Sequence, residues 1–220
     1  MQKNLRASGL KSFKAKKCKN CDELFTPERT FQQVCNFKCA RELSMKKQAK
    51  EKSKLWKVEK KVKKEKIKTL SDWKKDLQKE INTIVRLIDN GQPCIATGAT
   101  TGKRNAGHYY SVGSNDTLRF NLHNIHIQSE ASNTYKSGDT IKYQNGLRLI
   151  YGNDYFRKVQ RLQMIKPLKL TIPEIKEAIK TAKKIAKYLK LIEHNVYNPT
   201  ERMVLRENYN RLIGIYKQIK

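Results

Sequence analysis

The clearest pattern of apolar and polar positions lies between residues 71 and 90. Apolar side chains recur there every three or four residues, which is the spacing of one face of a helix. Ser71 is placed to cap such a helix, with Asp72 in its first turn, and Gly91 is placed to end it. The pattern therefore predicts a helix over 72–90 whose apolar face belongs to a core. The residues of that face are Trp73, Leu77, Ile81, Ile84, Val85 and Ile88.

Further helices are predicted in the C-terminal third of the chain. Two are expected over 140–152 and 154–163. Thr171 and Glu174 form a capping-box pattern at the start of another, and Asn198 precedes the proline that begins the last. The last two are typical of a helical hairpin, whose apolar stripe is either intramolecular core or the seam of a homodimer. The stripe comprises Ile172, Ile175, Ile179, Ala182, Ile185, Leu189 and Ile192, then Leu205, Tyr209, Leu212 and Tyr216.

Residues 40–68 form a lysine-rich run without Gly or Pro. Helix formers dominate and glutamates lie among the lysines, so an extended, mostly solvated helix is expected. This helix is either a charged spacer or an arm that follows a phosphate backbone. The excess of lysine over glutamate favours the arm, because bound anions relieve the repulsion between lysines. The DNA-binding residues expected in this run are Lys57, Lys60, Lys61, Lys63 and Lys64.

The charge of the chain is strongly positive and unevenly spread. Its 48 Lys and Arg residues against 20 Asp and Glu residues give a formal net charge of +28. The excess lies in residues 1–70 and 140–220, whereas residues 71–139 are nearly neutral. This balance favours nucleic acid as the partner, with a membrane-surface or ribosome-associated protein as the alternatives. No stretch is apolar enough to span a bilayer or to serve as a signal peptide, so a cytoplasmic protein is expected.

Four of the five cysteines are clustered within residues 18–39. Clustered cysteines in a cytoplasmic chain indicate metal ligation before disulfide formation. The Cys-x2-Cys spacing at the start of the cluster lets two thiolates bind one tetrahedral ion, and so short a segment has little core of its own. A structural zinc is therefore predicted in preference to free buried thiols. Its ligands are Cys18, Cys21, Cys35 and Cys39.

The residues between 103 and 139 have the types that a hydrolytic site needs. His108 lies in a predicted hairpin, Asn124 follows a predicted short strand that carries Asn121, and Asn133 lies at a predicted helix start. Phosphodiester hydrolysis needs a base that takes a proton from water and a hard cation that stabilises the leaving oxygen. A neutral histidine supplies the base, and an amide oxygen can ligate the cation. Taken singly, His108 is as easily a hairpin histidine with satisfied hydrogen bonds, and Asn133 a plain helix cap.

Taken together, these segments resemble HNH nuclease sites, and in particular the NinG/Rap family of lambda-type phages. The family consists of recombination nucleases that act on branched DNA. The resemblance extends over residues 15 to about 185, including the cysteine cluster. It implies a metal-dependent endonuclease for Holliday junctions and D-loops, located in the host cytoplasm. The matching segments are Ala106-Gly107-His108-Tyr109, Leu118-Arg119-Phe120-Asn121, Asn124-Ile125-His126 and Asn133 to Gly138.

The resemblance also implies roles for individual residues. His108 is the general base, Asn124 orients the loop near it through hydrogen bonds to the backbone, and Asn133 ligates a catalytic Mg²⁺ or Mn²⁺. Of His123 and His126, one is expected to line the site and the other to be solvated. Basic residues around the site are expected to contact phosphates of the DNA. These are Lys103, Arg104, Arg119 and Lys136.

The chain departs from the family pattern at two places. Many HNH sites carry an acidic metal ligand just before the base, but here that residue is Gly107, with Asn105 two residues earlier. The family has a second metal knuckle with four cysteines. In this chain, one of those positions is still a cysteine and the other three are residues with hydroxyl groups. Such a set does not make a zinc site, so this core is expected to fold through hydrogen bonds and packing. The four positions are Cys94, Thr97, Ser129 and Ser132.

These expectations combine into a mostly helical α+β protein. Its predicted parts are a basic arm (1–17), a four-cysteine zinc finger (18–45), a lysine-rich linker helix (46–70), a small treble-clef or HNH ββα-metal core (71–165) and a C-terminal helical hairpin (166–220). The last helix looks like an addition to the family core. The alternative function is a non-catalytic zinc-finger protein that binds nucleic acid on a degenerate HNH core, and a third is a ribosome-associated zinc protein.

Overall fold

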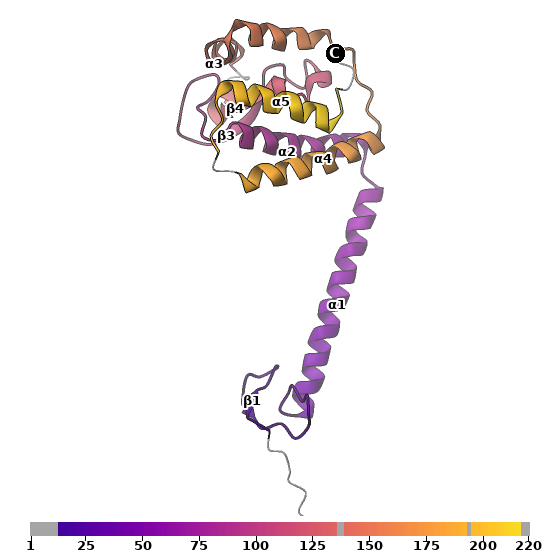
Figure 1. The fold of residues 1–220 in the computed structure, drawn as a ribbon. Helices are drawn as coiled ribbons and strands as arrows, with labels where there is room; N and C mark the ends of the chain where they lie inside the picture. The colour runs from indigo at the N-terminus through magenta and orange to yellow at the C-terminus, as the bar shows by residue number, and fades with distance from the viewer. Residues whose placement is uncertain (1–12, 136–138, 193–194, 217–220) are drawn as a thin grey trace, which may run out of the picture. The chain divides into compact units, whose positions relative to one another are not determined.

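The computed structural model describes residues 13–135, 139–192 and 195–216. The chain divides into two compact units, Met1–Ile67 and Lys68–Lys220. Helices dominate and the strands are short, so the predicted mostly helical α+β class is confirmed (Figure 1). Among the described residues, no helix combines the length and the apolar character that a membrane span requires.

The first unit consists of a small hairpin followed by one long helix. β1 (Lys16–Lys17) pairs antiparallel with β2 (Leu24–Phe25). α1 (Phe37–Lys66) begins after Asn36, whose side chain accepts a hydrogen bond from the Cys39 backbone N–H at 2.8 Å. Cys39 is the only buried residue of α1. The predicted solvated, lysine-rich helix is therefore confirmed, and it starts three residues earlier than residue 40.

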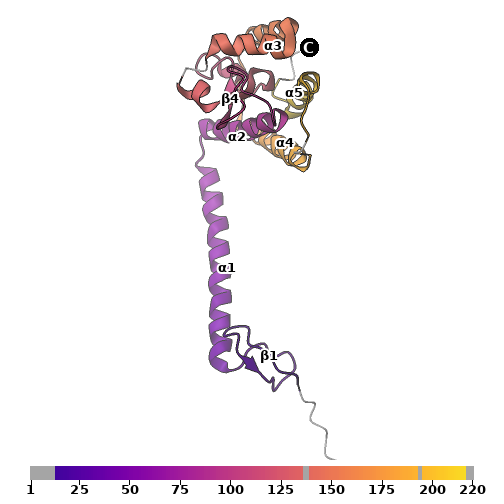
Figure 2. The same ribbon diagram turned by 90° about the vertical axis from the view of Figure 1, so that its left-hand side faces the viewer.

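The second unit is layered around α2 (Leu70–Ile88). The predicted apolar face of α2 is buried, and α4 (Ile172–Leu191) packs its own apolar face against it. The β-hairpin of this unit lies on the other side of α2 (Figures 1 and 2). The apolar stripe of α4 is therefore intramolecular core.

The start of α2 differs from the prediction. Thr69 rather than Ser71 caps the helix: its hydroxyl accepts from the Asp72 N–H at 3.3 Å, and the Asp72 carboxylate accepts from the Thr69 N–H at 3.1 Å. Thr69 has the extended backbone that a cap requires, whereas Ser71 already lies inside the first turn. At the start of α4, the predicted capping box of Thr171 and Glu174 is confirmed.

The hairpin of the second unit is formed by β3 (Arg104–His108) and β4 (Ile125–Ser129), which pair antiparallel. The connection between them contains two short 3-10 turns, η1 (Asp116–Leu118) and η2 (Leu122–Asn124). The prediction of a strand around the first asparagines is therefore wrong. Asn124 ends a helical turn, and the strand begins at the next residue.

A five-residue π-helical turn, η3 (Ala131–Tyr135), follows β4. Asn133 lies inside this turn and not in the first turn of a regular helix, which corrects the prediction. The next helix is α3 (Thr140–Arg161), interrupted at Gly152, where φ is 85°. Glycine adopts that backbone readily, and the expected division into two helical segments is confirmed. A 3-10 turn, η4 (Leu162–Met164), ends the segment.

The last helix, α5 (Pro199–Ile213), is anchored by a buried ion pair. Arg206 is fully buried, and its Nη2 donates to both carboxylate oxygens of Asp89, at 2.8 and 2.7 Å. The same carboxylate accepts from the Ile127 backbone N–H at 2.9 Å, and Arg206 Nε donates to the Leu122 carbonyl at 3.0 Å. One guanidinium thus joins the end of α2, η2 and β4. α5 is therefore an integral part of the core of this unit.

Replacing Arg206 tests the anchor. Arg206→Leu leaves the buried Asp89 carboxylate with the longer contact to Arg202, at 3.5 Å. The free energy of unfolding is therefore expected to fall by about 3–5 kcal/mol. Arg157→Leu is the matched control, because Arg157 pairs with Asp154 on the surface and its loss is expected to cost less than about 1 kcal/mol. Urea unfolding followed by circular dichroism measures both, and equal losses would contradict the anchoring role.

Candidate functional site

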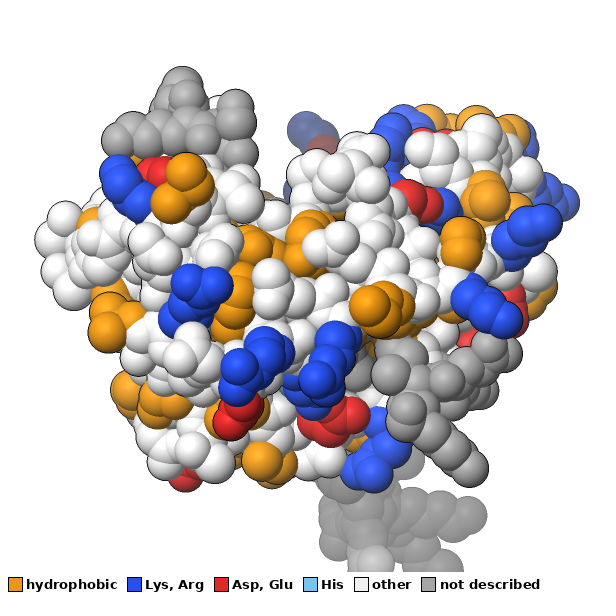
Figure 3. Space-filling view, turned by 90° about the horizontal axis from the view of Figure 1, so that it is seen from above, with side chains coloured by type: hydrophobic (Ala, Val, Ile, Leu, Met, Phe, Trp, Pro, Cys, Tyr) orange, Lys and Arg blue, Asp and Glu red, His pale blue; other side chains and the backbone are white. Residues whose placement is uncertain are grey.

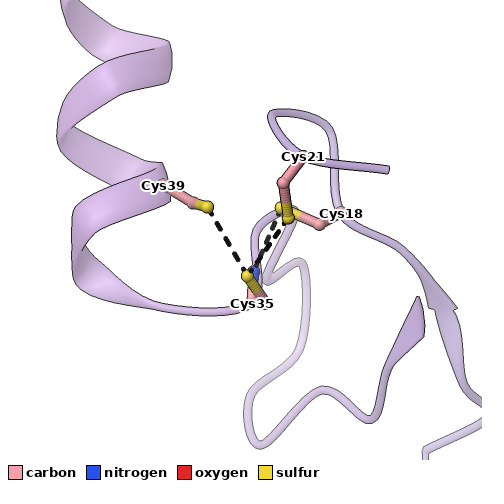
Figure 4. A group of neighbouring side chains, drawn as sticks. All are labelled: Cys18, Cys21, Cys35 and Cys39. Atoms are coloured by element: carbon pink, nitrogen blue, oxygen red, sulfur yellow. Dashed lines mark hydrogen bonds between the residues drawn. The ribbon is translucent and has the colours of Figure 1, made fainter. Parts of the chain in front are cut away.

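Four cysteine sulfurs converge in the first unit (Figure 4). All four Sγ atoms lie within 4.8 Å of one another. Cys18 and Cys21 flank the turn after β1, Cys35 precedes α1, and Cys39 lies in the first turn of α1. The structure therefore brings together the cysteines predicted as ligands, and their sulfurs are close enough to hold one metal ion such as zinc.

The protonation of these thiols favours a cation at the centre of the cluster. Burial opposes ionisation of Cys18, but the backbone N–H groups of Asn20, Cys21 and Cys35 lower its pKa to about 6. Burial and the neighbouring thiols raise the pKa of Cys35 to about 12. One thiolate therefore forms easily and hinders the next, because like charges are crowded together. A divalent cation removes this repulsion, and thiolates are the form of cysteine that binds it.

His108 ends β3, and its ring is held by the backbone. Its Nε2 lies 3.0 Å from the carbonyl oxygen of Arg119. A carbonyl oxygen can only accept, so Nε2 carries the proton and Nδ1 keeps its lone pair. Burial lowers the pKa of His108; the contact with the carbonyl opposes this shift, and the Arg119 guanidinium adds to it. The ring is therefore neutral at pH 7 with Nδ1 as its basic atom, which is the state that a general base requires.

The side chain of Asn124 holds the loop that presents this carbonyl. Its Oδ1 accepts from the Tyr110 N–H at 2.8 Å, and its Nδ2 donates to the carbonyls of Tyr110 at 3.0 Å and Leu118 at 3.2 Å. Leu118 directly precedes Arg119, so these bonds fix the backbone that sets the tautomer of His108. The expected hydrogen bonds from Asn124 to the backbone are present, and its part in catalysis stays a prediction.

Gly107 is packed too closely for any side chain. A Cβ atom at this position would lie 2.0 Å from Oε1 of Gln128 and 3.0 Å from Oδ1 of Asn133. The two amide oxygens thus occupy the space into which an acidic residue before the base would project. Gln128 is fully buried, and its Nε2 donates to the Ser132 hydroxyl at 2.9 Å. Asn133 on η3 therefore lies beside the residue that directly precedes His108.

His123 and His126 are both buried, so the expectation that one is solvated is wrong. His126 Nδ1 lies 3.0 Å from the hydroxyl of Tyr143, which donates to the Gly107 carbonyl at 3.0 Å. The Tyr155 hydroxyl lies 3.3 Å from His126 Nε2 and 3.1 Å from His123 Nδ1. Burial lowers the pKa of both rings. These histidines therefore link α3 to the backbone of β3 through a chain of hydrogen bonds.

The basic residues predicted to contact phosphates differ in how available they are. The ammonium group of Lys103 lies 2.6 Å from a carboxylate oxygen of Glu130. The Arg119 guanidinium lies 3.6 Å from a carboxylate oxygen of Asp116 in η1. One guanidinium nitrogen of Arg104 is enclosed by protein. Lys136 lies outside the described residues. The lysines predicted in α1 are all exposed, namely Lys57, Lys60, Lys61, Lys63 and Lys64.

Hydrogen bonds occupy the place of the second metal knuckle. The Ser129 N–H donates to Cys94 Sγ at 3.2 Å, and the Cys94 thiol lies 3.6 Å from the Ser129 hydroxyl. The Ser132 N–H donates to that hydroxyl at 3.3 Å, and the Thr97 hydroxyl accepts from the Ala99 N–H at 3.4 Å. Across the described part of the chain, the cysteines of the first unit are the one group of His, Cys, Asp or Glu side chains placed to hold a metal.

Some residues that hold the loop near His108 were missed by the sequence analysis. Asn210 Oδ1 accepts from the Leu122 N–H at 3.0 Å. The Tyr216 hydroxyl accepts from the Phe120 N–H at 3.2 Å and donates to the Thr117 carbonyl at 2.8 Å. These partners lie 88 to 99 residues apart in the sequence, so no local pattern marks them. For Tyr216 the one available signal was its hydroxyl within the apolar stripe predicted for the last helix, and Asn210 carried no such signal.

Metal content tests the cysteine cluster. With one complete set of four cysteine ligands, the purified protein is expected to contain one zinc ion per chain. Cys18→Ser removes a ligand and is expected to release the zinc and unfold the first unit, because the metal stabilises so small a fold. Cys94→Ser is the control and is expected to keep its zinc. Elemental analysis measures both, and two zinc ions per wild-type chain would contradict the assignment.

Gly107→Ala tests the packing beside His108. The added methyl group meets the Gln128 side chain, so the free energy of unfolding is expected to fall by about 1–3 kcal/mol. In a Gln128→Ala background the same substitution is expected to cost less, because the obstructing amide is gone. Thermal unfolding of the four proteins gives the coupling energy. Equal costs in both backgrounds would show that Gln128 does not fill this space.

Comparison with known proteins identifies the family to which the chain is similar. The model described as "Bacteriophage Lambda NinG protein" matches residues 10–193. Protein ninG of Escherichia phage lambda is 33% identical over 146 residues, which are 59% of this chain and 72% of that protein. Protein ninG of Salmonella phage P22 is 32% identical over 146 residues, again 59% of this chain and 72% of that protein. No solved structure matches the chain. On the extent of these matches, the chain belongs to the NinG family of phage proteins.

Proposed function

We propose that this protein is a metal-dependent DNA endonuclease that acts on branched recombination intermediates such as Holliday junctions and D-loops. The observation that carries the proposal is the state of His108. Its ring is neutral, a backbone carbonyl holds the proton on Nε2, and Nδ1 is left as the basic atom. The preference for branched DNA rests only on the resemblance to recombination nucleases.

In the proposed reaction, Nδ1 of His108 accepts a proton from water, which turns the water into a nucleophile toward a phosphodiester. Oδ1 of Asn133 would be the protein ligand for Mg²⁺ or Mn²⁺. When bound, such a cation supplies charge stabilisation at the leaving oxygen. The Asn133 oxygen lies beside Gly107, and His108 is the next residue along the chain. The proposed metal ligand and the proposed base are therefore close to one another. β3, β4 and η3 then correspond to an HNH ββα-metal core, with η3 in the place of its helix.

The first unit has a binding role in this proposal. Its four cysteines would hold a structural zinc, because four thiolates leave no open coordination position for chemistry. The exposed lysines of α1 contact phosphates, which position the protein on DNA without reading its sequence.

A non-catalytic zinc-finger protein that binds nucleic acid on a degenerate HNH core is the second candidate. The observation in its favour lies at Gly107, where the amides of Gln128 and Asn133 fill the space that a carboxylate ligand needs. A neutral amide attracts a divalent cation less strongly than a carboxylate does. On this second reading the protein binds DNA through its basic residues and does not cleave it.

Cleavage of a four-way junction with Mg²⁺ or Mn²⁺ separates the two candidates. His108→Ala removes the base, so the rate is expected to fall by about 100-fold or more. Junction binding, measured by gel shift, is expected to stay the same because phosphate contacts elsewhere carry it. Asn133→Ala is also expected to slow cleavage, and raised Mg²⁺ or Mn²⁺ partly restores its rate if the amide is a ligand.

The two variants serve as controls for each other. No cation restores the rate of His108→Ala, because a cation cannot take up the proton. If wild-type protein binds junctions and never cleaves them with either cation, the second candidate stands. If His108→Ala cleaves at the wild-type rate, another residue is the base.

A further inference from the structure

α4 presents a row of lysines on the side opposite its buried face. Its last three turns, residues 180–191, contain five lysines and no acidic residue, and every one of these lysines is exposed. The apolar side of α4 packs on α2, so the lysines project from a helix that is held from behind. We call this row the α4 lysine face. It consists of Lys180, Lys183, Lys184, Lys187 and Lys190.

The charges of the α4 lysine face are mostly not neutralised by the protein. Of its five lysines, Lys180 alone has a carboxylate of another described residue within 4.0 Å, that of Glu177 at 3.5 Å. The face crossed by α3 differs, because cationic and acidic side chains lie next to one another there (Figure 3). Arg157, for example, lies 2.6 Å from Asp154. The α4 lysine face is therefore a concentrated site for an anionic partner.

The dimensions of this face fit the backbone of a duplex. From its first lysine to its last the helix rises by about 15 Å, and double-stranded DNA carries one negative charge per about 1.7 Å of its axis. Tyr188, 57% exposed, lies beside the lysines and offers a ring to sugar or base. An anionic membrane fits less well, since the apolar side of α4 is buried against α2 and cannot enter lipid.

The α4 lysine face and the hairpin of β3 and β4, whose first strand ends at His108, lie on different sides of α2 (Figures 1 and 2). Duplex DNA is stiff over about 150 base pairs, so one straight duplex at His108 does not bend around the unit to reach α4. We propose that the α4 lysine face binds a second duplex arm of a branched DNA whose first arm lies at His108. This inference rests on the proposed function and gives its branched substrate a physical basis.

Equilibrium binding without added Mg²⁺ or Mn²⁺ tests the inference independently of cleavage. Full-length Lys183→Glu/Lys187→Glu protein is compared with wild type on a four-way junction and on a linear duplex of the same arm length. The variant is expected to lose junction affinity by about 10-fold or more, and the log–log salt slope to fall by about 2, because two phosphate contacts are lost. Its affinity for linear duplex is expected to stay within about twofold, since that DNA still binds at the hairpin and at α1.

The matched control is Lys75→Glu/Arg157→Glu, which removes the same charge from positions already paired with Asp72 and Asp154. It is expected to bind both DNAs as wild type does, and circular dichroism verifies that both variants are folded. Unchanged junction affinity in the α4 variant overturns the inference, and so do equal losses on junction and duplex, which indicate a general phosphate-binding surface. Failure of the nuclease proposal looks different, because the α4 variant then loses junction binding while wild type never cleaves.

Discussion

One buried charge pair, Arg206 with Asp89, is the interaction on which the second unit depends. Burial by itself would lower the pKa of Arg206, but the Asp89 carboxylate raises it, so the guanidinium stays charged inside the protein. Such a cation is tolerated only where its donors find acceptors. The Asp89 carboxylate and the carbonyls of Leu122 and Ile125 provide acceptors for Nε and Nη2, the last at 3.4 Å. The hydrogen bonds of one side chain on α5 therefore fix the positions of η2, of β4 and of the end of α2.

The position of that loop decides the chemistry available at His108. Asn124 fixes the loop from within, while Asn210 and Tyr216 hold it from the C-terminal side. The carbonyl of Arg119 that sets the histidine tautomer belongs to this braced segment. Because its surroundings hold the imidazole in one tautomer, its basic nitrogen is fixed in place without further rearrangement. The state of the imidazole thus follows from contacts that lie far from it in the sequence.

The sequence predicted those features whose signals are local. Helical periodicity predicted the faces of α2 and α4, and cysteine spacing predicted the cluster in the first unit. The roles of His108, Asn124 and Asn133 came from the family resemblance and stay predictions. Features set by distant contacts were missed. Arg206, 117 residues from Asp89, looks like a solvent-facing charge on an amphipathic helix. The packing of the Gln128 amide on Gly107 depends on strand register, which no local pattern specifies.

The long reach of the Arg206 contacts has a consequence for the order in which the protein matures during translation. The hydrogen bonds that hold the cysteine cluster to itself and to α1 join residues at most 26 positions apart, so this part can form soon after it emerges from the ribosome. The loop beside His108 is different, because its carbonyl at Leu122 is 84 residues from Arg206 and its N–H at Leu122 is 88 residues from Asn210. Contacts of such separation form late, since the intervening chain has to be made and ordered first. A nascent chain therefore acquires its basic, cysteine-containing part well before the loop that sets the state of His108.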